Sequence, residues 1–149
     1  MTTLSSFTHL VPGDHGLSVL STFREDGGIH SCVVNAGVLR HPRTGADVVG
    51  LVAAGGTRKL RNLRANSRAT IVARVGWEWS GVEGSADVIG PDDPAPDVDA
   101  EALRLLLRDI FRAAGGTHDD WDGYDGVMAE ERRAAVLITP QRTYGNARR

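Results

Sequence analysis

Short apolar segments separated by turn residues dominate the chain between residues 17 and 89. Residues 17–24 alternate apolar and polar side chains, residues 26–28 suit a tight turn, and residues 29–38 resume the extended pattern, which predicts a β-hairpin. Residues 48–53 form a β-branched run without polar alternation, as expected for a strand covered on both faces. Such strands with short connections favour an antiparallel barrel over a parallel sheet.

Three further strands are predicted, over residues 69–75, 77–89 and 134–139, where Pro140 is expected to interrupt the last one. Glycines at positions 81 and 84 indicate a bulge or bend, which the closing of a barrel requires. We therefore expect a mainly β (α+β) fold, an antiparallel split β-barrel with a few helices.

One long helix interrupts this series of strands. Apolar residues recur at helical spacing from Leu103 to Ala114, and Gly115-Gly116 then ends the pattern. A second, shorter helix is predicted over residues 121–131. The whole chain, residues 1–149, is expected to form one domain, in which residues 1–16 are a loosely ordered N-terminal segment.

Composition and the absence of certain motifs indicate the cellular compartment and exclude several classes of partner and site. The lone Cys32 excludes an internal disulfide, and the chain opens without a charged segment followed by an apolar run, so we expect a cytoplasmic protein. The apolar runs are far shorter than the roughly eighteen residues of a membrane span, so no membrane partner is expected. The five histidines show no metal-ligand spacing, and neither a nucleophile elbow nor a dinucleotide glycine fingerprint is present.

A basic segment over residues 57–68 is the strongest sign of a ligand. It carries five cations and no acid between Arg58 and Arg68, and it contains Lys59, the only lysine of the chain. The preceding Gly55-Gly56 lets backbone amides approach a ligand, and Thr57 is placed to cap a short helix. This pattern suits a phosphate, although a solvated basic surface helix shows the same pattern.

Charge is distributed unevenly along the chain. Residues 1–75 hold nine cations and four acids, whereas residues 76–149 hold eight cations and fifteen acids. Two chains could face one another through this asymmetry, or the basic half could attract an anion. Nucleic acid is not an expected partner, because the second half is acidic and aromatic residues for stacking are few.

Several motifs together resemble the pyridoxamine 5′-phosphate oxidase-like family. They are the order of hairpin, buried strand and basic segment, the Lys59-x-x-Asn62-Leu63 core, the cluster from Asp120 to Tyr124, and the terminal stretch from Ile138 to Gly145. Within that family the chain is most similar to the actinobacterial oxidoreductases that use the deazaflavin coenzyme F420.

This resemblance implies a homodimeric split β-barrel with cofactor sites at the subunit boundary. By resemblance, residues of two strands line the cofactor ring, namely Ser31, Cys32, Val33, Val34, Asn35, Leu51, Val52 and Ala53. Phosphate contacts are implied for Arg58, Lys59 and Asn62, while Arg61 and Arg64 could reach the acidic tail of the deazaflavin. Trp77 and Trp79 correspond to aromatics offered across the dimer interface, where a dimer-core contact is an equal alternative.

The resemblance further implies an enzyme in which reduced coenzyme F420 passes a hydride to an electron-poor conjugated organic substrate. The nearest alternative is an FMN-dependent oxidase or reductase of the same fold. FMN has one phosphate and no acidic tail, so it would leave the cations at Arg61 and Arg64 unexplained. A third possibility is a non-catalytic protein that binds a flavin, a deazaflavin or a tetrapyrrole. No catalytic residue or proton donor is assigned.

Overall fold

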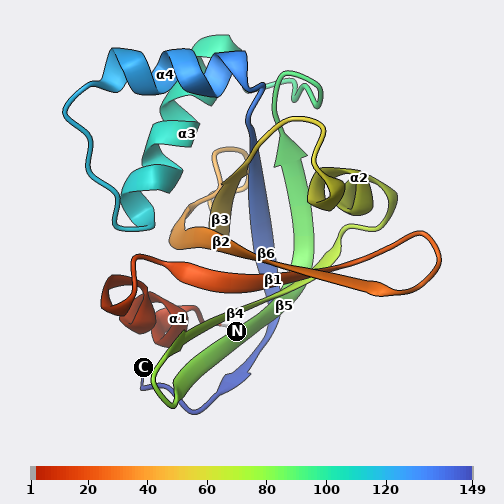
Figure 1. The fold of residues 1–149 in the computed structure, drawn as a ribbon, viewed down its shortest axis with the longest axis vertical. Helices are drawn as coiled ribbons and strands as arrows, with labels where there is room; N and C mark the ends of the chain where they lie inside the picture. The colour runs from red at the N-terminus through yellow and green to blue at the C-terminus, as the bar shows by residue number, and fades with distance from the viewer. Residues whose placement is uncertain (1–2, 149) are drawn as a thin grey trace.

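Six antiparallel strands close into a barrel in the computed structural model, which describes residues 3–148 (Figure 1). Around the barrel the strand order is β1-β2-β3-β6-β5-β4, and β4 pairs with β1 to complete it. The elements are α1 (Ser5–Leu10), a 3₁₀ turn (Val11–Gly13), β1 (Leu17–Phe23), β2 (Ile29–Arg40), β3 (Asp47–Ala53), α2 (Arg58–Ala65), β4 (Arg68–Val75), β5 (Glu78–Ile89), α3 (Ala100–Ala113), α4 (Trp121–Glu130) and β6 (Ala134–Gly145).

The predicted hairpin, barrel and two later helices are confirmed. β1 and β2 pair in register, with Leu20 opposite Cys32, and their hairpin extends away from the rest of the barrel (Figure 1). The glycine signal in β5 is also confirmed, because the pairing of β5 with β6 shifts between Glu83 and Gly84. A side chain at Gly84 would place its Cβ 1.9 Å from the carbonyl oxygen of Thr139, so only glycine fits this bulge.

The expected interruption at Pro140 is wrong. β6 continues to Gly145, and Pro140 lies opposite Gly84 at the irregularity, where the next paired residue of β6 is Arg142. Proline within a sheet is found chiefly at edges and bulges, so its place at this irregularity is compatible with a continuous β6.

The N-terminal segment is more ordered than we expected. Residues 5–10 form α1, whose Phe7 and Leu10 side chains are buried within the barrel core. Burial of these side chains holds the helix against the barrel, although polar residues dominate the segment. The expectation of a loosely ordered segment is therefore wrong for residues 3–16, while residues 1 and 2 lie outside the described part of the chain.

Two hydrophobic cores share β3. Inside the barrel, Val49 and Leu51 pack against Leu20 and Ile71, and on the outer side Val48 packs with apolar residues of α3 and α4. This explains why β3 lacks polar alternation, because both of its faces are covered.

α3 begins at an N-cap in which the Asp99 carboxylate accepts a hydrogen bond from the Ala102 N–H at 2.8 Å.

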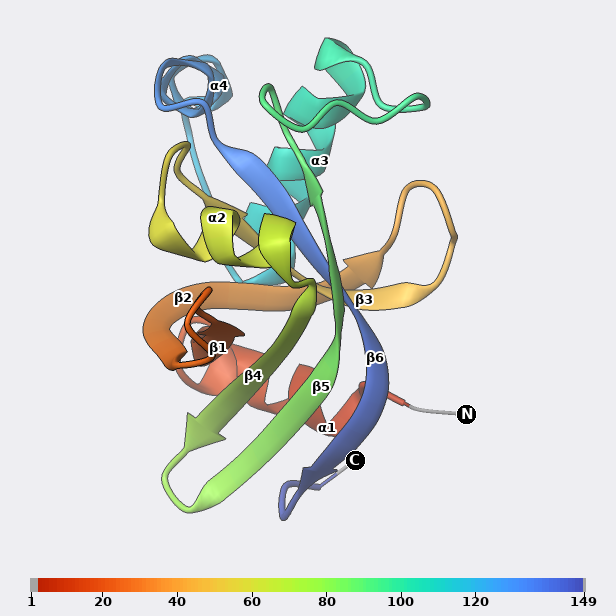
Figure 2. The same cartoon turned by 90° about the vertical axis from the view of Figure 1, so that its right-hand side faces the viewer.

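α2 lies apart from the other helices (Figure 2), and it packs against β1 and β5. α3 and α4 lie together at one end of the molecule, and α1 lies towards the other end (Figures 1 and 2). No helix within residues 3–148 has the length and apolar character that a membrane crossing needs.

Candidate functional site

The helix predicted in the basic segment forms as α2, with one side buried. Leu60 and Leu63 enter the barrel core, and the Asn62 side chain is buried between them and β1. The Asn62 amide donates a hydrogen bond to the Thr22 hydroxyl at 3.1 Å. Asn62 therefore anchors α2 to the barrel and does not line the cavity described below, so its implied contact with a phosphate stays a prediction.

Thr57 precedes this helix in an extended conformation, as an N-cap residue does, but its side chain makes no capping hydrogen bond. The Thr57 hydroxyl is buried and has no hydrogen-bond partner in the described chain. Buried hydroxyl groups are rarely left without a partner, so this oxygen stands out as an unused polar atom next to the cavity described below. The predicted capping of α2 by the Thr57 side chain is therefore not observed, and the Thr57 hydroxyl makes no hydrogen bond in the described chain.

Three cations of α2 also have no protein partner. Within residues 3–148, no acid lies within salt-bridge distance of Arg58, Lys59 or Arg61. Arg64 differs, because its guanidinium donates to both carboxylate oxygens of Asp93 at 2.8 and 2.6 Å. That hydrogen-bonded pair raises the pKa of Arg64, and because the Asp93 side chain is only 17% exposed, Arg64 is less available than the unpaired cations to reach an acidic cofactor tail.

A cavity of about 570 Å³ opens beside this helix and contains both Thr57 and Lys59 in its wall. The segment that leads into it is shaped by two glycines. A Cβ at Gly55 would lie 2.8 Å from the Arg132 carbonyl oxygen, and Gly56 has a φ of +77°. Ala53, Ala54, Thr57 and Lys59 therefore form one stretch of the cavity wall, an arrangement that suits a phosphate.

The opposite wall comes from α3, which approaches β2 very closely. A Cβ at Gly37 would lie 2.2 Å from the carbonyl oxygen of Ala113, so the glycine permits the contact. The end of α3 and the following Gly115-Gly116 then border the cavity. Close packing at Gly37 thus places the C-terminal end of α3 against the strands that were predicted to hold the cofactor ring.

Aromatic residues complete this wall. Phe111 and Tyr124 line the cavity, and their rings lie 5.1 Å apart within a cluster that also includes His118 and Trp121. The Tyr124 hydroxyl donates a hydrogen bond to the Leu107 carbonyl oxygen at 3.0 Å, and burial raises the pKa of Tyr124. Tyr124 therefore offers an apolar ring edge to a ligand, while its hydroxyl is already occupied.

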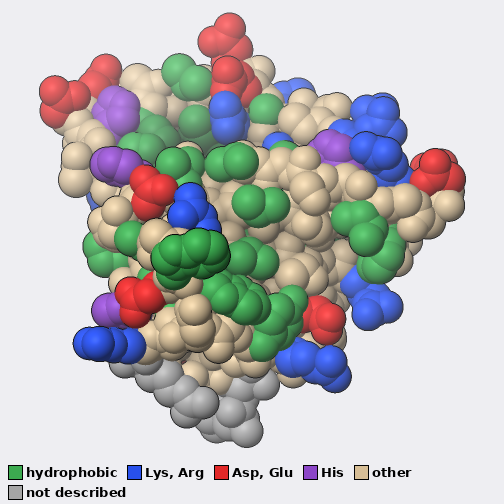
Figure 3. Space-filling model, turned by 60° about the horizontal axis from the view of Figure 1, so that its bottom comes forward, with side chains coloured by type: hydrophobic (Ala, Val, Ile, Leu, Met, Phe, Trp, Pro, Cys, Tyr) green, Lys and Arg blue, Asp and Glu red, His purple; other side chains and the backbone are tan. Residues whose placement is uncertain are grey.

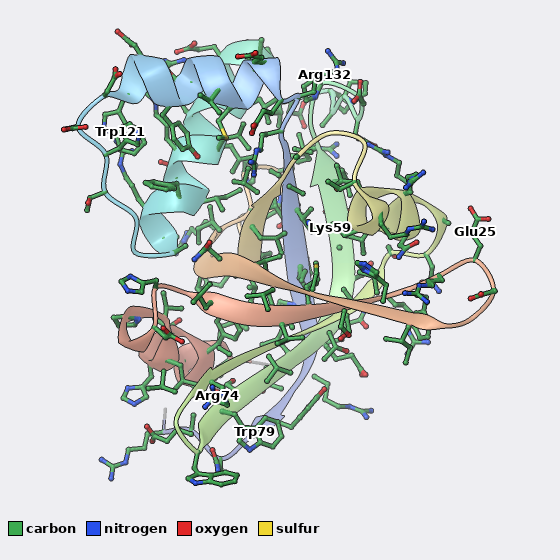
Figure 4. All side chains as sticks on the ribbon, viewed as in Figure 1. Glu25, Lys59, Arg74, Trp79, Trp121 and Arg132 are labelled. Atoms are coloured by element: carbon green, nitrogen blue, oxygen red, sulfur yellow. The ribbon has the colours of Figure 1, made fainter. Side chains whose placement is uncertain are left out.

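The cluster from Asp120 to Tyr124 has a local structural role as well. The Asp120 carboxylate caps α4 by accepting a hydrogen bond from the Gly123 N–H at 3.0 Å. Trp121 packs beneath the guanidinium of Arg112, which lies 4.4 Å from the ring centre. In Figure 4 Trp121 is at the outer end of α4, well away from Lys59.

Six of the predicted site residues line the cavity, and they come from β2, β3 and α2: Val33, Val34, Asn35, Val52, Ala53 and Lys59. Cys32 and Leu51 pack with the barrel core and do not line the cavity. Ser31 lies on the outer face and shares a hydrogen bond with Ser21, with the two hydroxyl oxygens 2.8 Å apart.

The remaining predicted site residues lie elsewhere. Arg58 and Arg61 are exposed on α2 and do not line the cavity. Trp77 lies in the turn before β5 and is 93% exposed, so the expectation that both tryptophans share one strand is wrong. Trp79 is on β5, and Figure 4 shows it far from Lys59 of the same chain.

Among the cavity residues that were not predicted as site residues are His15, Phe111, Met128, Arg133 and Tyr124, of which only Tyr124 belongs to one of the motifs behind the family resemblance. Met128 lies near the end of α4, and Arg133 directly precedes β6. His15 borders the cavity through a turn with a φ of +56°, and its carbonyl oxygen accepts a hydrogen bond from the Asn35 amide at 2.8 Å. Only the three-dimensional fold brings these segments together.

The outer face of the barrel carries a continuous apolar row. Val33, Val19, Val72, Gly81 and Tyr144 are direct partners across five neighbouring strands. Val33 is 66% exposed, and Val19 and Tyr144 are also exposed. Figure 3 shows hydrophobic side chains gathered across the face of the molecule that includes these strands. Extended apolar patches of this kind often mark protein contacts.

Comparison with known proteins supports the fold. No family model matches the sequence. The chain is similar to the conserved hypothetical protein Rv2991 from Mycobacterium tuberculosis, with 18% identity, a TM-score of 0.69, and coverage of 99% of this chain and 86% of that chain.

Two further structures are also similar. One is an F420 reductase, with 17% identity, a TM-score of 0.58, and coverage of 91% of this chain and 94% of that chain. The other is a pyridoxamine 5′-phosphate oxidase-related, FMN binding protein from Nostoc punctiforme, with 13% identity, a TM-score of 0.67, and coverage of 94% and 79%. The chain therefore has the barrel fold of the pyridoxamine 5′-phosphate oxidase-related proteins, as its sequence motifs predicted.

Proposed function

We propose that this protein is an oxidoreductase that uses reduced coenzyme F420 to transfer a hydride to an electron-poor conjugated organic substrate. The observation that carries the proposal is the cavity whose wall contains both Lys59 and Thr57, a residue whose buried hydroxyl has no partner in the described chain. Two further unpaired cations, Arg58 and Arg61, flank Lys59 on α2. A phosphate-bearing ligand would supply the acceptors that these groups lack.

The residues of the cavity fit a cofactor with a phosphate at one end and a planar ring at the other. Lys59, Thr57 and the backbone at Gly55-Gly56 would hold the phosphate. The ring would lie along Val33–Asn35 and against Val52 and Ala53. When bound, the reduced deazaflavin supplies the hydride, as cofactors carry the demanding chemistry in such enzymes.

The chain itself positions the reactants and excludes water. Ile110, Phe111 and Met128 form an apolar wall against which a conjugated substrate could pack. Orientation of two bound reactants removes much of the entropic barrier to their reaction, and an apolar wall shields the reacting atoms from solvent. Asn35 is fixed by its hydrogen bond to the His15 carbonyl, which holds this edge of β2 in place.

The choice between coenzyme F420 and FMN depends on charge. FMN would occupy Lys59 and Thr57 with its single phosphate, whereas the acidic tail of F420 would also engage Arg58 and Arg61. Arg64 no longer supports this argument, because Asp93 neutralises it. Arg58 and Arg61, which have no acid partner in the described chain, still favour F420, whereas the similar folds include both an F420 reductase and an FMN binding protein.

We also propose that two chains form a homodimer through the apolar row of the outer face. The row from Val33 to Tyr144 would be covered by the same row of the second chain, and Trp79 lies beside it, with its ring 5.9 Å from that of Tyr144. Val33 belongs both to this face and to the cavity wall, so a dimer would border the cofactor site. Sedimentation should give about twice 15.9 kDa, and a monomer at micromolar concentration would contradict the proposal.

The proposed function is tested by titration followed by turnover. Apoprotein is titrated with F420 and with FMN at one salt concentration, with fluorescence as the readout. Reduced F420 is then mixed with protein and a panel of electron-poor quinones and enones, and its reoxidation is followed by absorbance. Tighter binding of F420 with protein-dependent reoxidation supports the proposal. Tighter binding of FMN indicates the flavin enzyme, and F420 binding without turnover of any acceptor indicates a non-catalytic binding protein.

A further inference from the structure

A second cavity, of about 520 Å³, shares only Met128 and Arg133 with the cavity described above. Its walls are largely apolar and come from the end of β5, the following loop, α3 and α4: Ile89, Val98, Leu103, Leu107, Met128 and Ala129. The volume falls within the range of about 300–1,000 Å³ that is usual for small-molecule sites. None of the functions proposed above uses this space.

The loop of residues 90–99 covers this cavity and is held at several points. Gly90 and Asp93 exchange two backbone hydrogen bonds of 3.0 Å, and the Val98 N–H donates to the Ala95 carbonyl oxygen at 3.1 Å. Arg64 of α2 binds Asp93, and Arg132 binds Asp92. The covering loop is therefore built into the fold, so the cavity has a defined shape.

Charged groups at the cavity favour an anion. Three arginines line it, Arg104, Arg132 and Arg133, against two acids. Both acids are already engaged, since Asp99 caps α3 and Asp125 accepts hydrogen bonds from arginines of α3. A ligand ammonium group would find no free carboxylate among the lining residues.

Two of the arginines are able to exchange partners. Arg132 pairs with Asp92, and Arg133 pairs with Glu131 at 2.8 Å, and in each pair both side chains are at least 31% exposed. Exposed pairs of this kind contribute little to stability, so a carboxylate held in the cavity could replace Asp92 or Glu131. The planar guanidinium fork also matches a carboxylate in two-point contact. Figure 4 shows Arg132 where α4 meets β6, beside the covering loop.

We infer that the second cavity binds a small apolar monocarboxylate, with its hydrocarbon body between α3, α4 and the loop of residues 90–99 and its carboxylate at Arg132 and Arg133. Met128 and Arg133 line both cavities, so this site shares a wall with the proposed cofactor site. The inference does not depend on the proposed redox function, because it rests on groups of the second cavity.

The test uses full-length apoprotein and naphthalene-2-carboxylate, with naphthalene-2-carboxamide as an uncharged probe of the same shape. Backbone amide shifts are followed by NMR during titration. The carboxylate should cause saturable shifts at residues 89–107 and 128–133, and it should bind at least roughly tenfold more tightly than the carboxamide. Equal affinity of the two probes, or shifts centred on the outer face of the barrel, would overturn the inference.

Variants locate the site. Arg132→Gln and Arg133→Gln should each reduce carboxylate affinity, by roughly three- to tenfold, and leave carboxamide affinity unchanged. Arg112→Gln, which removes an arginine on α3 that does not line the cavity, is the matched control and should bind both probes like the wild type. Leu103→Trp should fill the cavity and block both probes, and normal binding by this variant would contradict the site.

Lys59→Ala separates this inference from the proposed function. Lys59 lines only the first cavity, so its loss should weaken F420 binding and leave naphthalene-2-carboxylate binding unchanged. Loss of carboxylate binding in Lys59→Ala would show that the probe occupies the first cavity, and the second site would then be rejected. Failure of F420 to bind any form of the protein would reject the proposed function alone.

Discussion

The cations of α2 and those of α3 differ in what surrounds them. On α3, Arg104 and Arg108 both donate to the Asp125 carboxylate of α4, and Arg104 also pairs with Glu101. On α2, Arg58, Lys59 and Arg61 have no acid within salt-bridge distance in the described chain. The α3 cations therefore join two helices, whereas the α2 cations remain available for an anion from outside the chain.

The paired cations of α3 and the unpaired cations of α2 also differ in their electrostatic energy. Hydrogen bonds from Arg108 lower the pKa of Asp125, and the same contacts raise the pKa of Arg108. Such mutual shifts mean that each charge stabilises the other in the folded protein. Clustered cations without acids repel one another instead, and a bound anion relieves that repulsion. A basic segment without acids thus indicates binding more reliably than a count of basic residues does.

Lys59→Ala should produce the largest change in binding. Loss of one charge-assisted contact to a phosphate costs about 1.5–3 kcal/mol, which is roughly a ten- to hundredfold loss of F420 affinity. Thermal stability should stay near that of the wild type, because Lys59 makes no ion pair in the described chain. Lys59→Arg should restore part of the affinity, since a planar fork cannot occupy the position of a compact ammonium group.

Fluorescence titration of each variant with F420 measures this effect. Unchanged affinity in Lys59→Ala, together with a large loss in Arg58→Ala or Arg61→Ala, would place the phosphate elsewhere along α2. The unpaired cations of α2 would then still be the anion-binding group, but the phosphate would not bind at Thr57 and Lys59.

Arg61→Ala should produce the next largest change, and only for one cofactor. We expect the wild type to bind F420 at least about tenfold more tightly than FMN, because extra charge-assisted contacts of order 1 kcal/mol each suffice for that ratio. Arg61→Ala should reduce F420 affinity roughly three- to tenfold and FMN affinity by less than about twofold. Parallel titrations measure both values, and an equal loss for the two cofactors would contradict contact with the acidic tail.

Local features of the sequence were enough to predict most of the fold. Alternation in residues 17–24, the buried run of β3 and the helical spacing from Leu103 to Ala114 each depend on neighbours along the chain. The glycine at position 84 was a sign of the bulge in the sequence itself, because only a residue without a side chain fits there. The error at Pro140 arose because the bulge on β6 depends on its pairing with β5, which a single strand does not show.

The candidate site was less predictable, because its decisive contacts join distant residues. Asn62 resembles a ligand-binding residue in sequence, but the Thr22 hydroxyl that binds it is 40 positions away. Arg64 resembles its neighbour Arg61, and only Asp93, 29 positions away, separates their roles. The unpaired hydroxyl of Thr57 is likewise visible only when every surrounding group has been placed.

Asp125→Asn should lower thermal stability and leave F420 affinity nearly unchanged, which is the opposite of what we expect for Lys59→Ala. At pH 7 it should lower the melting temperature by roughly 2–4 °C, the shift expected from a modest loss in a domain of about this size. F420 affinity should change little, because Asp125 does not line the first cavity. Calorimetry and fluorescence titration give the two values. If Asp125→Asn lost more F420 affinity than Lys59→Ala, the cations of α3 could no longer be separated in function from the unpaired cations of α2.

The same variant makes a prediction for pH. Because the pKa of Asp125 is lowered in the folded state, its stabilising contribution is complete above its unfolded pKa of about 3.9 and is lost as pH falls through the folded value. The difference in melting temperature between wild type and Asp125→Asn should therefore be constant from pH 7 to 5 and shrink below about pH 4. A difference that grows on acidification would contradict the sign of this shift.

Arg64→Ala should have the smallest effect on binding, although Arg64 and Arg61 lie on the same helix. Because Asp93 already binds the Arg64 guanidinium through two hydrogen bonds, removal of the side chain should change F420 affinity by less than about twofold. The tether between α2 and the loop of residues 90–99 would be lost, so amide hydrogen exchange in that loop should become faster. Arg61→Ala, which removes an unpaired cation three positions earlier, is the matched control. If Arg64→Ala weakens F420 binding as much as Arg61→Ala does, then Arg64 exchanges Asp93 for the cofactor tail, and pairing with an acid does not withdraw a cation of α2 from binding.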